Sequence, residues 1–139
     1  MYNICEDNRE QIENEFMALV LNKNEVIELL QIKPKLLKNP KNKKMLEYAI
    51  ECYKEHGIVM PTLIGEKHKD FDVEYFVDLL DELWYPRTWK KQLEVAQESI
   101  LKFYKEDYIK VLNEHLKLRR INYNEFMEKM KQLDNVQLL

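Results

Sequence analysis

The sequence contains no glycine or proline after Pro86, so residues 87–139 lack the two residue types that most often interrupt a helix. Apolar side chains recur there at three- and four-residue intervals, which is the spacing of a helix face. We therefore expect a helix that starts behind Thr88 and runs to about Arg119, over about 48 Å. Because an average globular helix has only about 11–12 residues, this one is too long to lie wholly against a compact core.

A second helix is expected close behind the first. Asn122 and Glu125 have the spacing of a capping box, in which each side chain bonds the backbone N–H of the other residue. Phe126 and Met130 then fall on one helix face. Since very few residues separate the two helices, they should pack antiparallel. The sequence therefore predicts a helical hairpin over residues 87–139, the last of which would begin a linker.

Residues 1–86 have the pattern of several shorter helices. The chain has only two glycines and four prolines, whereas sheet-rich folds need many of both for tight turns. The expected boundaries are a capping box at Asn8 and Gln11, a helix start at Asn39–Pro40, a helix end at His56–Gly57 and a helix start at Asp72. We therefore expect an all-α protein, with a compact helical head at residues 1–86 followed by the long antiparallel hairpin.

The predicted hairpin leaves apolar surface to be covered, because two helices alone cannot bury both of their apolar faces. The head, a second copy of the hairpin or another protein must cover them. We infer self-association first, as a homodimer that can build a larger assembly. The residues expected to take part are Leu93, Ile100, Tyr104, Tyr108, Val111, Leu112, Tyr123, Phe126, Met127 and Met130.

The composition offers little for an active site. One serine and two threonines leave almost nothing for hydroxyl chemistry, and no GxxxxGK[ST] motif is present to hold a nucleotide phosphate. The three histidines stand apart in the sequence, and two cysteines are too few for a zinc cluster or a disulfide scaffold. We therefore expect a chain that is not an enzyme and that has no cofactor and no metal.

The location is expected to be the cytoplasm. The first residues are acidic where a secretory signal has basic ones, and the longest strongly apolar run, residues 16–21, is far too short to cross a bilayer. We expect no membrane contact. The net charge of −3 does not by itself indicate or exclude a nucleic-acid partner.

Charge is concentrated in two segments: residues 33–44 hold six lysines and no acid, and residues 70–85 hold six acids and no base. The lysine segment is either a solvated loop or a contact for phosphates or for an acidic protein surface. Aromatic residues are not interleaved with the lysines, so stacking of single-stranded bases is not indicated. The two segments are also complementary enough to pair between copies. The lysines concerned are Lys33, Lys35, Lys38, Lys41, Lys43 and Lys44.

Trp84, Tyr85 and Trp89 cluster where the predicted head meets the hairpin. Core packing at this junction is the simpler explanation. A binding surface for a partner is the alternative, because tryptophan and tyrosine dominate the energetics of such sites.

Several short motifs follow one another in a characteristic order. They are EFMALVL at residues 15–21, NKKMLEYAI at 42–50, YKEHG at 53–57, YFVDLL at 75–80, ILKFYK at 100–105 and RINYNEF at 120–126. In this order they resemble the N-terminal domain of replicative DNA helicases of the DnaB family, especially the versions in low-GC bacteria and their phages. The resemblance covers about residues 8–134. The lysine segment and the Trp84–Trp89 cluster do not match the family pattern.

The resemblance implies a non-catalytic collar domain, which assembles as a trimer of dimers on a hexameric ATPase motor. In that family the collar docks primase or a helicase loader during DNA replication, and the hairpin makes the dimer contact. DNA would be contacted only indirectly or weakly. The motor with its P-loop is not part of this sequence, so we expect either an excised domain or a stand-alone relative.

Two other functions stay open. The helicase-binding C-terminal domain of primase shares the head-and-hairpin shape, and it would bind a helicase collar instead of forming one. A small nucleic-acid-binding protein would act through the lysine segment, and its affinity would fall steeply with salt.

Overall fold

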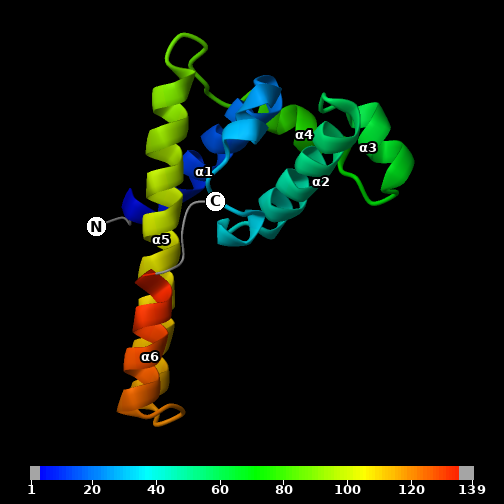
Figure 1. The fold of residues 1–139 in the computed structure, drawn as a ribbon. Coiled ribbons are helices and arrows are strands. Elements are labelled where there is room, and N and C mark those ends of the chain that lie inside the picture. The colour runs from blue at the N-terminus through cyan, green and yellow to red at the C-terminus, as the bar shows by residue number, and fades with distance from the viewer. Residues whose placement is uncertain (1–3, 135–139) are drawn as a thin grey trace.

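The computed structural model describes residues 4–134. The regular secondary structure of this range consists of helices, with no β-strand among the described residues. The predicted all-α class is therefore confirmed for this part of the chain. In chain order the elements are α1 (Ile4–Asn22), the 3-10 helices η1 (Asn24–Leu29) and η2 (Pro34–Leu36), α2 (Pro40–His56), α3 (Pro61–Lys67), α4 (Val73–Leu80), α5 (Trp89–Lys117) and α6 (Tyr123–Asp134) (Figure 1).

Local hydrogen bonding sets the ends of α2 and α4. The side-chain oxygen of Asn39 accepts a hydrogen bond of 2.9 Å from the backbone N–H of Lys41 at the start of α2. Asp72 caps α4 in the same way, through the N–H of Tyr75 at 3.0 Å. Gly57 ends α2 in the left-handed conformation, with φ of 73°, which glycine adopts without a steric cost. These three predicted boundaries are confirmed.

The turn between α5 and α6 is also closed by its own side chains. Asn122 Oδ1 accepts a hydrogen bond of 2.8 Å from the N–H of Glu125, and Glu125 Oε1 accepts one of 3.4 Å from the N–H of Asn122. This predicted capping box is confirmed. The one expected at Asn8 and Gln11 is wrong, because α1 already begins at Ile4 and both residues lie within it.

The core of the head is built around α1. Its residues 16–20 are fully buried, and α1 contacts α2, α4 and the first half of α5. Leu46 of α2, Ile64 of α3 and Phe76 of α4 belong to the same apolar cluster, and so do residues of α5 as far along as Ile100. The first half of α5 is therefore part of the packed head.

The second half of α5 leaves the head. In Figure 1, α5 is one continuous rod, and α6 runs antiparallel along the end that points away from α2 and α3. The main contacts of α6 are with α5, and Leu112 and Leu133 are buried within this pair of helices. We call residues 105–134 the distal hairpin, since this is the part of the predicted hairpin that projects from the head.

Candidate functional site

Three of the residues predicted for self-association are unavailable to a second copy. Leu93 and Ile100 are buried in the apolar cluster of the head, because α1 packs against this half of α5. Leu112 is buried in the distal hairpin. The expectation that these three side chains face another chain is wrong.

The distal hairpin nevertheless exposes large apolar side chains. Val111 is 51% exposed, Tyr123 65% and Met127 40%. All three belong to the residues predicted for self-association. Leu118, at the end of α5, is 51% exposed and was missed, because it lies beyond the periodic stripe. The remaining predicted residues are half-buried: Tyr104, Tyr108, Phe126 and Met130.

The aromatic cluster at the junction divides into two roles. Trp84 and Trp89 are half-buried and pack against the core of the head, and the Lys23 ammonium lies 5.3 Å from the centre of the Trp89 ring. Tyr85 is exposed and lines a shallow groove of about 310 Å³ together with Val95. Core packing therefore accounts for the two tryptophans, and Tyr85 is the most exposed of the three side chains.

The six lysines of the lysine segment (residues 33–44) surround the start of α2. All are exposed except the half-buried Lys43. Lys44 forms an ion pair with Asp70, and the Lys41 ammonium lies 5.4 Å from the centre of the Tyr75 ring. The pKa of Asp70 is lowered, mainly by the hydrogen bond from Lys44 and next by the hydrogen bond from Tyr48. The basic and acidic segments therefore already meet at one point within a single chain.

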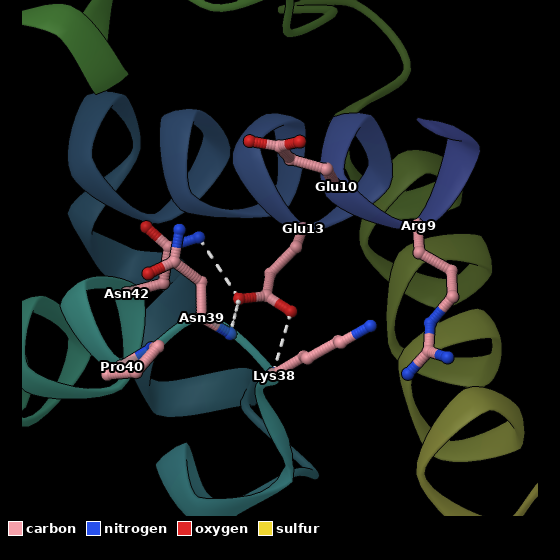
Figure 2. Close-up of a pocket in the computed structure, with 7 residues that line it drawn as sticks. All are labelled: Arg9, Glu10, Glu13, Lys38, Asn39, Pro40 and Asn42. Carbon is pink, nitrogen blue, oxygen red and sulfur yellow. Dashed lines mark hydrogen bonds between the residues drawn. The ribbon is translucent and has the colours of Figure 1, made fainter. Parts of the chain in front are cut away.

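A buried carboxylate holds the lysine segment against α1. Glu13 accepts hydrogen bonds from the backbone N–H of Lys38 at 2.9 Å, from that of Asn39 at 3.0 Å and from the side-chain amide of Asn42 at 3.1 Å (Figure 2). Two of these donors are backbone groups at the start of α2 that have no partner inside the helix. Glu13 therefore fixes the path of the backbone that carries the lysines, beside a cavity of about 290 Å³.

An ion pair joins α1 to α5 at the point where α5 leaves the head. The guanidinium of Arg9 donates to both carboxylate oxygens of Asp107, with 2.9 Å between Nη1 and Oδ1, and it lies 4.9 Å from the centre of the Phe103 ring. The hydrogen bond to Arg9 holds the pKa of Asp107 below its ordinary value, and the same bond raises the pKa of Arg9. In Figure 2 the Arg9 side chain extends away from Glu13 toward α5.

The lysine segment and α5 together form a groove of about 290 Å³. Lys35, Lys38 and Lys43 line it from one side, and Tyr104 and Tyr108 line it from the other. The two tyrosine rings are nearly parallel, with 6.4 Å between their centres and 20° between their planes. We call this the basic groove. Aromatic residues are not interleaved with the lysines in the sequence, but the fold brings these two tyrosines, which are distant in sequence, beside the lysine segment.

Two further observations concern residues 4–134. Among the side chains that the structure describes, no group of three or more histidine, cysteine, aspartate or glutamate residues is placed to hold a metal ion. No helix described there is long and apolar enough to cross a membrane.

Comparisons with known proteins do not identify a family. Neither the scan against protein-family models nor the searches of curated proteins and of solved structures found a match to this chain.

Proposed function

We propose that this chain is a non-catalytic interaction and oligomerisation module of a replicative DNA helicase, with the head-and-hairpin arrangement of the DnaB-family N-terminal domain. The observation that carries the proposal is the distal hairpin, which projects from the head and exposes Leu118, Tyr123 and Met127. Apolar side chains on a projecting arm add nothing to the core of their own chain. Covering them with a second surface is favourable, because it removes apolar area from water.

In this proposal the distal hairpins of two copies pack against each other. The heads stay accessible, so that primase or a helicase loader can dock on them, and three such dimers would form a collar. The order of the motifs from residues 15–21 to residues 120–126 supports the same assignment.

The size of the apolar surface sets the expected strength of the contact. A standard stable interface buries about 800 Å² on each partner, and the exposed apolar residues of the distal hairpin supply only part of such an area. We therefore expect a dimer with a dissociation constant in the micromolar range, which tightens further only when several copies assemble.

A pair of matched substitutions tests self-association. Met127→Asp places a charge on the distal hairpin, whereas Met60→Asp places the same charge on the head, and the two methionines are 40% and 41% exposed. By light scattering after size exclusion at high micromolar concentration, the unmodified chain and Met60→Asp should be dimers and Met127→Asp a monomer. A monomeric unmodified chain, or a dimer that survives Met127→Asp, contradicts the proposal. Circular dichroism checks that both variants are folded.

A capture experiment tests the partner. The immobilised chain should retain the helicase-binding domain of a primase from the same source. Retention of a helicase N-terminal domain without retention of the primase domain would contradict the proposal and would place the chain on the primase side of the same interaction.

A further inference from the structure

We infer that the basic groove binds single-stranded nucleic acid, with its lysines on the phosphates and its tyrosines against the bases. This inference goes beyond the proposed function and does not depend on self-association. It follows from the placement of two kinds of side chain that the sequence keeps far apart.

The charge of the groove favours a polyanion. Lys35, Lys38, Lys43 and Arg9 line it, and Asp107 is the single acid among the described residues that line it. The Asp107 carboxylate is bonded to the Arg9 guanidinium on both oxygens, so the charges of these two residues offset each other and the three lysines give the described lining its net positive charge. Basic groups along a concave surface reinforce one another's potential and attract phosphates.

The aromatic wall of the groove is held in place before any ligand binds. Tyr104 and Tyr108 lie one turn apart on α5, both are half-buried, and Tyr104 packs against the core of the head. Their ring planes differ by only 20°. Because these rings are already ordered, a base that stacks on them has little side-chain entropy to offset. Stacking on tyrosine tolerates every base, so we expect binding with little sequence preference.

The basic wall is held equally well. Lys38 belongs to the stretch of backbone that Glu13 fixes to α1, with 2.9 Å between the backbone nitrogen of Lys38 and Glu13 Oε2. Lys43 lies in the first turns of α2, whose start Asn39 caps. The distance between the two walls is therefore set by the packing of the head, which suits a ligand that must reach both walls at once.

An acidic protein segment explains the groove less well. Its carboxylates would form ion pairs with the lysines, but they have no favourable contact to make with a pair of parallel tyrosine rings. Duplex nucleic acid is also a poorer fit, because its bases are stacked on one another and cannot reach the tyrosines. Lysines and aromatic rings along one groove are the combination that single strands require.

Fluorescence anisotropy of a labelled oligothymidylate, titrated with the full chain at several salt concentrations, tests the lysines. Lys35→Gln with Lys43→Gln should weaken binding and reduce the slope of log affinity against log salt by about 1.4, since each phosphate contact contributes about 0.7. The control is Lys90→Gln with Lys91→Gln, which changes the net charge equally but lies about 25 Å along α5 from Tyr108. Equal loss in both double variants, or no binding at low salt, overturns the inference.

The tyrosines are tested in the same assay. Tyr108→Leu should weaken binding at least about fivefold with an unchanged salt slope, and Tyr108→Phe, which keeps the ring, should bind like the unmodified chain. Tyr123→Leu removes an exposed tyrosine outside the groove and should have no effect. Unchanged binding by Tyr108→Leu overturns the inference. Equal competition by polyglutamate or by duplex DNA also overturns it, in favour of an acidic protein partner or of double-stranded binding.

Discussion

Removal of the Glu13 carboxylate should destabilise the head strongly. Three donors, at 2.9 to 3.1 Å, lose their acceptor together in Glu13→Ala. A hydrogen bond to a charged group contributes about 1.5–3 kcal/mol, and the cost of burying the carboxylate offsets part of that sum. Water entering the adjoining cavity of about 290 Å³ recovers a further part. We therefore expect the free energy of unfolding to fall by about 3–5 kcal/mol, a large share of the total for a domain of this size.

Urea unfolding followed by far-ultraviolet circular dichroism measures this change. Glu10→Ala is the matched control, because Glu10 lies one turn earlier on α1 and is exposed, and its cost should stay within about 0.5 kcal/mol. The loss of stability in Glu13→Gln should fall between those of the two alanine variants. The glutamine amide keeps one acceptor oxygen, but its NH₂ group faces a donor that lost its acceptor. If Glu13→Ala costs no more than Glu10→Ala, the assignment of Glu13 as the anchor of the lysine segment is refuted.

Three further predictions concern one charged side chain and the backbone at the two glycines. The pKa of Asp107 is lowered by Arg9, so the pair should stabilise the fold above the ordinary Asp value of 3.8 and lose that contribution as pH falls below it. Asp107→Asn should therefore cost up to about 1 kcal/mol at neutral pH and nothing in strong acid, measured by urea unfolding across pH; a pH-independent difference would contradict this. Gly57→Ala should lower stability by about 1–2 kcal/mol, because φ is 73° there although no neighbour lies within 4 Å. Gly65→Ala, inside α3 with only an ordinary contact to Phe71, should raise the thermal midpoint instead.

The helix boundaries were predictable because their chemistry is local. The cap hydrogen bonds of Asn39, Asp72 and Gly57 each join residues no more than four positions apart. Both partners of each bond can therefore be read from one short stretch of sequence. The same reasoning failed at Asn8, where the spacing of a capping box occurs inside a helix.

The covering of the α5 stripe was not predictable from its periodicity. A period of three to four residues shows which face is apolar, but it does not show what lies against that face. Leu93 and Ile100 lie on the stripe and are covered by the head, whereas Val111, further along the same helix, is 51% exposed. Only the path of α1 across α5 separates these cases, and that path depends on contacts between distant residues.

The basic groove and its anchor were missed for a related reason. Lys35 and Tyr108 come together only after α1, α2 and α5 have packed. Glu13 did have a signal in the sequence, since it occupies the same helix face as Phe16 and Val20, which are fully buried. An acid on an apolar face indicates a buried acceptor with partners elsewhere in the chain.

Hydrogen exchange at two protein concentrations tests most directly whether the distal hairpin binds a second copy. Peptides from residues 118–134 should exchange more slowly at high micromolar than at low concentration, because the dimer contact covers and orders them. Peptides from α2, which lies in the head, should exchange at the same rate in both samples. Identical exchange of residues 118–134 at both concentrations would show that no second copy covers the hairpin.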